Sequence, residues 1–446
     1  MSAPFALVEA TVVTGDSAGT VVPGMTIVVD DDGRIGQVGS TAAVTVPSGY
    51  RRIEASGLFV VPGLINAHAH LFADGKPLPP ILLKESAESL VSAFMHSPAG
   101  GWMLKRRTRT NVLTQLHSGV TTLRSVGDVG YEVVAVANEI AAGKYVGPRV
   151  LASGPLMAIT GGHGAPQIAL ISDSPWDARR NVRRSLRKGV TAIKIAATGG
   201  VTDARVVGEA GRPQMTEEEM TAICEEAHNA GIVVAAHAQS QAGITAALRA
   251  GVDTIEHGSS MSDEMTSLFK DNPRSLHGTS ALIPTLQACL PLVKLDPRIT
   301  GINAIARANA EMIGEEMLQG IRDALANDIA IGMGTDSALT HVTHYNTWRE
   351  LDMLVRFGGL TPAQALHAAT QSNARILGLD TVTGSIRTGL AADLVVLDEN
   401  PLTSFRTFTA PRYVVVGGAV LEAPAVTRFA EIDERLDSLE NDPSAR

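Results

Sequence analysis

Hydrophobic and polar positions divide the chain into three stretches of different periodicity. Residues 5–59 contain short runs of β-branched and apolar residues separated by turn-forming sequences such as Asp-Asp-Asp-Gly at 30–33, the pattern of strands joined by hairpin turns. The same pattern returns after residue 380, for example at 392–398. We therefore predict one small β-sandwich domain built from both ends of the chain, residues 1–59 and 380–446, with a charged terminal helix from about residue 431.

The middle stretch, residues 60–379, alternates short apolar runs with amphipathic helical segments. One helix is expected to begin with a capping box formed by Thr216 and Glu219. The apolar runs with the length of strands are residues 60–65, 120–123, 149–152, 190–195, 232–236, 252–255, 281–284 and 329–333. Eight such units predict an α/β fold, a (β/α)8 TIM-type barrel, whose active site lies at the carboxyl ends of the strands.

Two histidines close the first of these runs. His68 and His70 are two residues apart, and alternate residues of a strand face the same side, so both imidazoles should project together. Further ionisable or metal-binding side chains lie within or at the ends of later predicted strands: Lys194, His237, His257 and Asp336. Since the carboxyl ends of barrel strands meet on one face, these six residues predict a metal-dependent active site.

Lys194 is the unusual member of this set because it lies inside an apolar strand. A charged ammonium there would be destabilised by desolvation and by neighbouring cations. One interpretation is an extended side chain whose ammonium reaches solvent at the barrel rim. The other is a neutral amine that has added CO₂ to become a carbamate, an anion whose two oxygens can each bind one metal ion.

Composition limits the classes of partner. The chain has 446 residues, 37 basic and 46 acidic side chains, and a net charge of −9, so we expect a small-molecule substrate and neither nucleic acid nor a membrane as partner. No apolar run approaches the ~18 residues of a membrane span, and the first residues lack the pattern of a signal peptide. With only Cys224 and Cys289 present, a reducing, cytoplasmic location is expected.

The set of ligand residues, in this order along the chain, resembles that of the binuclear amidohydrolase superfamily. The sequences Gly-Gly-His-Gly at 161–164, Ala-Thr-Gly-Gly-Val at 197–201, Ile-Glu-His-Gly at 255–258 and Gly-Thr-Asp at 334–336 are similar to the imidazolonepropionase-like or prolidase-like branch. That branch includes Xaa-Pro and other dipeptidases and some hydrolases of aryl amides, carbamates and ureas. The resemblance covers nearly the whole chain, and relatives are often homo-oligomers, a state we also expect here.

The resemblance implies a mechanism with two divalent metal ions. His68, His70, Lys194 and Asp336 would hold one ion, and Lys194, His237 and His257 the other, with a hydroxide bridging both. Imidazole and carboxylate ligands suit Zn²⁺, with Mn²⁺ or Co²⁺ as alternatives. The hydroxide would attack the carbonyl of an amide-type C–N bond, and Asp336 would pass its proton to the leaving nitrogen.

Substrate contacts are expected from residues near the ligands. The family counterpart of His163 contacts the substrate carbonyl, so His163 is a candidate catalytic and substrate-binding residue, and Gln239 and His344 are further substrate-binding candidates. Prolidase-like relatives often have Tyr or His at the position of Gln239, where it helps hold a peptide carboxylate. An uncharged Gln therefore favours an N-aryl amide, carbamate or urea over a dipeptide or N-acyl amino acid. His341, Tyr345 and Arg349 could line the pocket or be structural.

Two other interpretations are weighed against hydrolysis of an amide. A mononuclear deaminase of a cyclic amidine would have a Glu shortly after His237 and no bridging lysine, whereas positions 239–241 are Gln-Ser-Gln and Lys194 is present. A non-catalytic scaffold would have lost ligands, and all six are present. Selectivity should reside in the insertions that follow the strands, residues 72–101, 157–174, 198–215 and 286–300.

Overall fold

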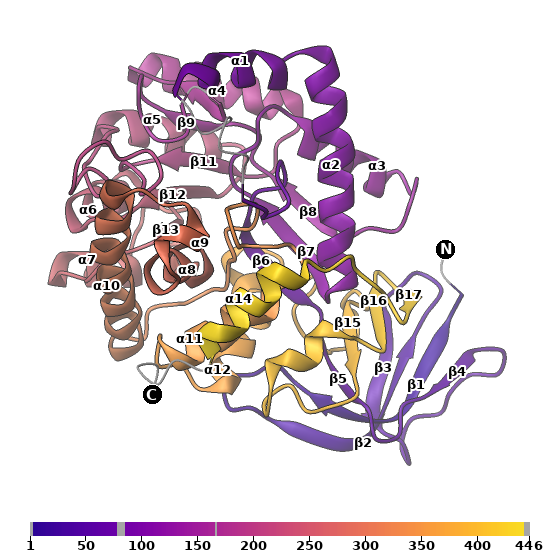
Figure 1. The fold of residues 1–446 in the computed structure, drawn as a ribbon. Coiled ribbons are helices and arrows are strands. Elements are labelled where there is room, and N and C mark those ends of the chain that lie inside the picture. Colours follow the sequence, from indigo (N-terminus) through magenta and orange to yellow (C-terminus); the bar gives the residue numbers. More distant parts are fainter. Residues whose placement is uncertain (1–2, 78–84, 166, 441–446) are drawn as a thin grey trace.

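The two ends of the chain share one β-sheet, in which strands from both termini lie side by side (Figure 1). The computed structural model describes residues 3–77, 85–165 and 167–440. Within them the sheet has eight strands in the order β17-β16-β15-β5-β1-β2-β3, with β4 paired to β1. They are β1 (Phe5–Val13), β2 (Val21–Val29), β3 (Ile35–Ser40), β4 (Arg51–Glu54), β5 (Phe59–Pro62), β15 (Leu394–Leu397), β16 (Tyr413–Val416) and β17 (Ala419–Glu422).

This terminal sheet is buried on both faces near its centre. Along β1, Phe5 and Leu7 pack in one hydrophobic cluster, and Ala6 and Val8 pack in another. Successive residues of a strand point to opposite faces, so one apolar strand supplies both clusters. The apolar runs at the termini thus form the expected β-structure, while the domain boundaries at 59/60 and 379/380 stay a prediction.

The first predicted barrel strand, 60–65, is divided at Gly63. Its first part is β5, which pairs with β15 in the terminal sheet; its second part is β6 (Leu64–Ala69), which pairs with β7 (Val120–Ser125). A Cβ atom at Gly63 would lie 2.1 Å from Oγ1 of Thr121, so only glycine allows this close approach. The single strand expected from the apolar run was therefore wrong.

The middle of the chain supplies parallel strands. One three-stranded sheet has the order β6-β7-β8, and a six-stranded sheet has the order β10-β9-β11-β12-β13-β14; every described pair in both is parallel. The remaining bounds are β8 (Arg149–Ala152), β9 (Leu156–Ala158), β10 (Ala169–Ile171), β11 (Ile193–Ala196), β12 (Val234–Ala238), β13 (Thr254–His257) and β14 (Ala281–Ile283). Parallel strands joined by helices confirm the α/β class.

The eighth predicted strand, 329–333, forms only isolated bridges. Ile331 bridges to Leu282 of β14, and Ser337 bridges to Ala69 of β6. The backbone N–H of Ala67 also donates to the carbonyl of Met333 at 3.0 Å. The segment from 329 to 337 therefore lies between β14 and β6. Regular pairing does not join all these strands into one sheet in the described residues, so a closed barrel stays a prediction.

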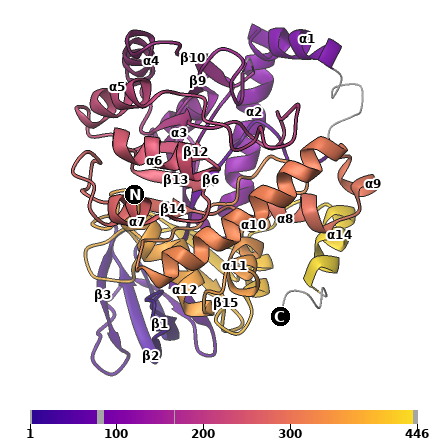
Figure 2. The same ribbon diagram turned by 90° about the vertical axis from the view of Figure 1, so that its left-hand side faces the viewer.

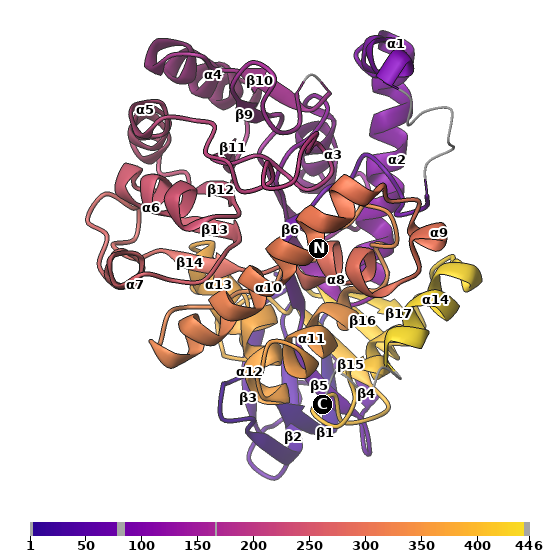
Figure 3. The same cartoon turned by 60° about the vertical axis from the view of Figure 1, so that its left-hand side comes forward.

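Helices cover the outside of the parallel strands, most visibly in Figures 2 and 3. They are α1 (Glu85–Met95), α2 (Pro98–His117), α3 (Glu132–Ala141), α4 (Pro175–Lys188), α5 (Glu217–His228), α6 (Gln241–Ala250), α7 (Asp263–Lys270), α8 (Leu286–Lys294), α9 (Pro297–Thr300), α10 (Ala304–Ala326), α11 (Thr347–Arg356), α12 (Pro362–His367), the π-turn η2 (Ala368–Ser372), α13 (Asn373–Ile376), the 3₁₀ turn η3 (Phe405–Thr409) and α14 (Ala430–Glu440). Thr216 and Glu219 form the predicted capping box of α5. Among the helices of the described ranges, none combines the length and apolarity needed to cross a membrane.

Candidate metal centre

The carboxyl end of β6 and the segment after residue 333 bring three predicted ligands together. His68 lies in β6 and His70 directly follows it. The Nε2 atoms of the two imidazoles lie 3.2 and 3.1 Å from Oδ1 of Asp336. All three residues are buried. A carboxylate oxygen facing two imidazole nitrogens is an arrangement that a bound cation would complete.

Two further histidines arrive from neighbouring strands. His237 lies in β12 and His257 ends β13, and their ring centroids are 4.6 Å apart. The ring of His257 lies 5.2 Å from that of His68. One ligand atom from each of His68, His257 and Asp336 can be chosen so that all lie within 4.8 Å of one another, which is close enough to hold one ion.

Each of the four imidazoles has one nitrogen bound to a protein oxygen outside the ligand set; in His68 and His70 the other nitrogen faces Asp336. This arrangement fixes the ring orientation of a metal-binding histidine. The pairs are His68 Nδ1 with Glu256 Oε2 at 2.5 Å, His70 Nδ1 with the Gly127 carbonyl at 2.8 Å, His257 Nδ1 with Thr285 Oγ1 at 2.7 Å and His237 Nε2 with the Gly199 carbonyl at 3.0 Å.

Lys194 lies in β11, is only 3% exposed, and its Nζ has no hydrogen-bond partner in the described part of the chain. Burial lowers the pKa of Lys194 to about 8, although the charges of Glu256 and Asp336 oppose the shift. A buried amine without a partner has unfilled hydrogen-bonding capacity. The donor set and this unpartnered nitrogen fit a site that is completed by a carbamate and metal ions.

The protonation states of the cluster also suit cations. Burial lowers the pKa of His237 and of His257 well below the usual range, so both imidazoles are neutral and keep a lone pair. Burial alone would raise the pKa of Asp336, but His68 and His70 hold it well below its usual range. Neutral imidazoles and an ionised carboxylate are the forms that bind divalent metals.

The backbone is strained around these ligands. Left-handed φ angles occur at His257 (73°), Thr285 (55°), Asp336 (56°), Ala338 (89°) and His341 (68°). Non-glycine residues rarely adopt this conformation, and it persists where surrounding contacts enforce it, commonly at functional sites. At His257 and Asp336 the strain falls on the candidate ligands themselves.

Glu256 and Arg124 are site residues that the sequence analysis missed. Both side chains are fully buried, and Arg124 Nη2 donates to Glu256 Oε1 at 2.8 Å, while the other Glu256 oxygen faces His68. Burial opposes ionisation, yet the charges of Arg124 and His68 hold the pKa of Glu256 far below its usual range. The available signal was a charged residue directly after each of two predicted strands, 120–123 and 252–255.

His163 lies beside the cluster, in the loop that follows β9. Its ring stacks on that of His237 with centroids 4.1 Å apart, and its Nδ1 contacts the carboxylate of Asp203. Gln239 follows His237 by two residues; it is 7% exposed, and its Oε1 has no partner among the described residues. His163 therefore lies against a candidate ligand, whereas Gln239 is a buried residue two positions after one, with an unpartnered oxygen.

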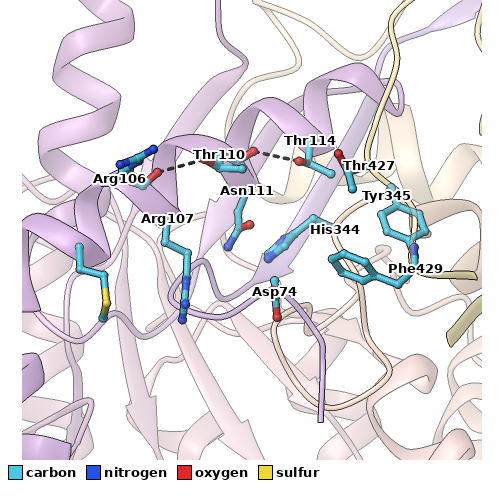
Figure 4. Close-up of a pocket in the computed structure, with 11 residues that line it drawn as sticks. Asp74, Arg106, Arg107, Thr110, Asn111, Thr114, His344, Tyr345, Thr427 and Phe429 are labelled. Carbon is cyan, nitrogen blue, oxygen red and sulfur yellow. Dashed lines mark hydrogen bonds between the residues drawn. The ribbon is translucent and has the colours of Figure 1, made fainter. Parts of the chain in front are cut away.

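The other candidates lie elsewhere or are engaged by protein groups. The ring nitrogens of His344 contact the Ala73 carbonyl at 2.8 Å and Gln115 Nε2 at 3.2 Å. His344 lines a pocket of about 430 Å³ beside α2, with Tyr345 and Phe429 on its wall (Figure 4). Because both nitrogens are occupied, His344 as it stands offers no open atom to a substrate at the metal cluster.

The three residues left ambiguous by the sequence contact the C-terminal part of the chain. Nε2 of His341 lies 3.3 Å from Nη1 of Arg435, and the Tyr345 hydroxyl accepts from the backbone N–H of Phe429 at 2.8 Å. Arg349 pairs with Asp437. These contacts tie the segment after Asp336 to α14 and to the residues just before it.

Comparisons with known proteins agree with this geometry. A protein of Bifidobacterium longum, provisionally assigned as a prolidase, is 48% identical and superposes with a TM-score of 0.88 over 99% of this chain and 100% of that chain. A Xaa-Pro dipeptidase with bound methionine in its active site is 26% identical, with a TM-score of 0.78 over 94% and 100%. Ochratoxinase of Aspergillus niger is 28% identical over 93% of this chain and 88% of its own.

A family model described as the amidohydrolase family matches residues 59–421, which include all six candidate ligands and both halves of the parallel-strand region. Divalent metals are general in this family, and the buried group of His68, His257 and Asp336 is a candidate site for one. The match covers most of the chain and agrees with the resemblance carried by the ligand pattern. This protein belongs to the amidohydrolase family and is a hydrolase that acts on C–N bonds.

Proposed function

We propose that this protein is a binuclear metal-dependent amidohydrolase that cleaves an amide-type C–N bond in a small substrate. The observation that carries the proposal is the buried cluster in which His68, His70 and Asp336 converge, together with the buried, unpartnered amine of Lys194 in β11. So many buried polar atoms do not increase the stability of the fold, because a polar atom that is buried without a partner costs free energy. Metal binding is the function that explains them together.

The proposed ligand sets divide the cluster in two. His68, His70 and Asp336 would hold one ion, His237 and His257 the other, and a carbamate on Lys194 would supply one oxygen to each. Imidazole and carboxylate donors favour Zn²⁺, with Mn²⁺ or Co²⁺ as alternatives. Two bound divalent ions would supply Lewis acidity toward a carbonyl oxygen and would acidify a water molecule.

The carbamate would form by addition of the neutral Lys194 amine to CO₂. The nitrogen forms a bond to carbon, one C=O π bond becomes a carboxylate oxygen, and the nitrogen releases a proton to water. The pKa of about 8 supports this step, because it leaves part of the amine neutral near physiological pH. The Lys194 ammonium would otherwise be buried without a hydrogen-bond partner.

Asp336 and His163 are the proposed catalytic side chains. The ionised Asp336, buried between His68 and His70, would accept a proton from the attacking water and then give it to the leaving nitrogen. His163 stacks on His237 at the edge of the cluster, where its ring can donate to the substrate carbonyl oxygen as negative charge develops there.

Two observations bear on the substrate class. The similarity to proteins named as prolidase and Xaa-Pro dipeptidase supports a dipeptide or N-acyl amino acid. Gln239 supports an uncharged amide, carbamate or urea, since a primary amide cannot supply the positive charge that a peptide carboxylate prefers. Its unpartnered Oε1 is suited to accept a hydrogen bond from a substrate N–H.

Metal analysis of purified wild-type and Lys194→Ala proteins tests the proposed centre. We expect about two divalent ions per chain in the wild type, and loss of both metal and hydrolysis in the variant. Lys270→Ala, at the exposed end of α7, is the control and should keep both. At most one ion per wild-type chain, together with an active Lys194→Ala variant, would refute the binuclear centre.

A hydrolysis screen tests the substrate class. The panel pairs Xaa-Pro and other dipeptides with N-acyl amino acids, N-aryl amides, carbamates and ureas. Turnover of the uncharged compounds with little turnover of dipeptides is the result that the Gln239 argument expects. Strong turnover of dipeptides alone would remove that argument while leaving the metal centre intact.

A further inference from the structure

We propose that Asp203 is a positioning residue for His163, forming with it an Asp–His pair that presents the open Nε2 of the ring to the substrate oxygen. The proposal rests on the amidohydrolase function proposed above and adds a residue to it. Asp203 lies in the loop after β11 and His163 in the loop after β9, so the pair joins two of the insertions.

The first observation is the contact itself. The Asp203 carboxylate contacts His163 Nδ1, and the same oxygen, Oδ2, accepts from the backbone N–H of Gly164 at 3.1 Å. Since a carboxylate only accepts, the Nδ1 atom of the ring must carry the hydrogen. Within the described residues no hydrogen bond occupies Nε2, so that atom is free to face a substrate.

The second observation is the charge of the carboxylate. The Asp203 side chain is 46% exposed, and the charge and the hydrogen bond of His163 outweigh its partial desolvation and hold its pKa below the usual range. A carboxylate that accepts from Nδ1–H holds the imidazole in one tautomer and in one orientation. Nε2 is then the nitrogen that the ring directs away from Asp203 and toward a substrate.

The third observation is that other residues of the loop after β11 also contact or closely approach His163. A Cβ atom at Gly200 would lie 2.3 Å from His163 Nδ1, so glycine is required for the ring to occupy this place. The side chain of Gln214 accepts from the backbone N–H of His163 at 2.9 Å. Three residues of this loop therefore position His163. Gly200 leaves room for the ring, Asp203 contacts its Nδ1, and Gln214 binds its backbone N–H.

The fourth observation links this loop to the metal centre. The carbonyl of Gly199 accepts from Nε2 of His237 at 3.0 Å, and the His237 ring stacks on the His163 ring with an interplanar angle of 25°. The loop after β11 therefore orients a candidate ligand and a candidate oxyanion donor together. We infer that its role is alignment of the two groups with each other.

A double-mutant cycle tests the proposal. Asp203→Ala should lower kcat by about 10²-fold, the loss expected for a misplaced catalytic group, with little change in KM and no change in metal content. In a His163→Ala background the same substitution should lower kcat by less than about 2-fold, because the ring that it positions is absent. Asp203→Asn keeps an acceptor and removes the charge, so a loss smaller than that of Asp203→Ala is expected.

The matched control is Asp16→Ala. Asp16 is another loop carboxylate that accepts from a backbone amide, that of Thr20 at 2.9 Å, and it lies in the loop between β1 and β2 of the terminal sheet. It should keep full activity. Equal losses from Asp203→Ala with and without His163 would overturn the proposal, because they would show that the carboxylate serves only the loop.

The two proposals fail in different ways. A wild-type protein without bound metal and without hydrolysis of any compound in the panel would refute the proposed function. A wild-type protein that binds metal and hydrolyses a substrate, while Asp203→Ala retains full kcat, would refute only the positioning role of Asp203.

Discussion

Lys194 can be charged or neutral, and its surroundings decide between these states. In water a lysine amine is almost entirely protonated at neutral pH. Inside β11 the amine is buried without a hydrogen-bond partner, and burial lowers its pKa to about 8. Glu256 and Asp336 limit this shift, so the amine titrates within an accessible range of pH. Its reactivity toward CO₂ should therefore depend on pH.

The pH dependence of reconstitution is the prediction at this scale. Protein stripped of metal and CO₂ is given Zn²⁺ at a fixed concentration of dissolved CO₂, and the rate of recovery of activity is measured. The neutral amine increases as pH rises through about 8, so recovery should be roughly eightfold faster at pH 8.5 than at pH 7. Recovery that is independent of both CO₂ and pH would contradict carbamate formation.

At the scale of elements, the strands carry the candidate ligands, and neighbouring strands and loops orient their side chains. The strands β6, β12 and β13 place histidines at one edge, and each ring is oriented by a hydrogen bond from one nitrogen to an oxygen of another element. The clearest case is Glu256, which receives hydrogen bonds from Arg124 in β7 and from His68 in β6. Three strands are thereby connected through one buried carboxylate.

Removal of Arg124 should therefore destabilise the fold strongly. Both members of the Arg124–Glu256 pair are fully buried, and Arg124→Met leaves the carboxylate without its cation, at a cost of about 3–5 kcal/mol. Arg412→Met is the control, because the Arg412–Asp398 pair is half exposed and should contribute roughly 0–1 kcal/mol. Denaturant unfolding measures both, and similar losses would contradict the structural role assigned to the buried pair.

A second prediction at this scale concerns Gly200. In Gly200→Ala the new Cβ would meet His163 Nδ1 at 2.3 Å, so the ring must move, and we expect kcat to fall by at least about 10-fold while metal content is unchanged. Gly101→Ala in α2 is the control, since nothing lies within 4 Å of a Cβ there. Full activity of Gly200→Ala would show that the ring position is not needed.

At the scale of the whole molecule, the candidate ligands connect distant parts of the chain. His68 is near its beginning and Asp336 is on the segment that lies between β14 and β6. Such a site exists only in the folded protein. A metal ion that binds there therefore stabilises the native state relative to the unfolded state. Bound metal should therefore connect β6 with the segment that follows β14.

Removal of metal should lower the melting temperature. Each bound ion contributes about 2.7 kcal/mol when its free concentration is 100 times Kd, and this contribution disappears when a chelator is added. Differential scanning calorimetry with and without chelator measures the change, and Lys194→Ala should show a much smaller one. An identical melting temperature of wild-type protein in both conditions would contradict a metal site formed by folding.

Much of the architecture was readable from the sequence alone. The two hydrophobic periodicities predicted β-structure at both termini and strand–helix alternation between them. They did so because burial of one face or one stripe is a local requirement of each element. The ligand candidates were equally visible, since a His-x-His pair on a strand and polar residues at strand ends are local features.

Only the tertiary structure decided how these residues work together. In the structure the first apolar run is divided between two sheets at Gly63. The carboxylate of the Arg124–Glu256 pair contacts His68, and the Asp203 carboxylate contacts His163. Both ring nitrogens of His344 are occupied by protein groups. Each of these outcomes depends on contacts between segments far apart in the chain, which no local pattern contains. The sequence by itself determined the elements and the chemical groups, and the packing of the strands determined which atoms of those groups meet.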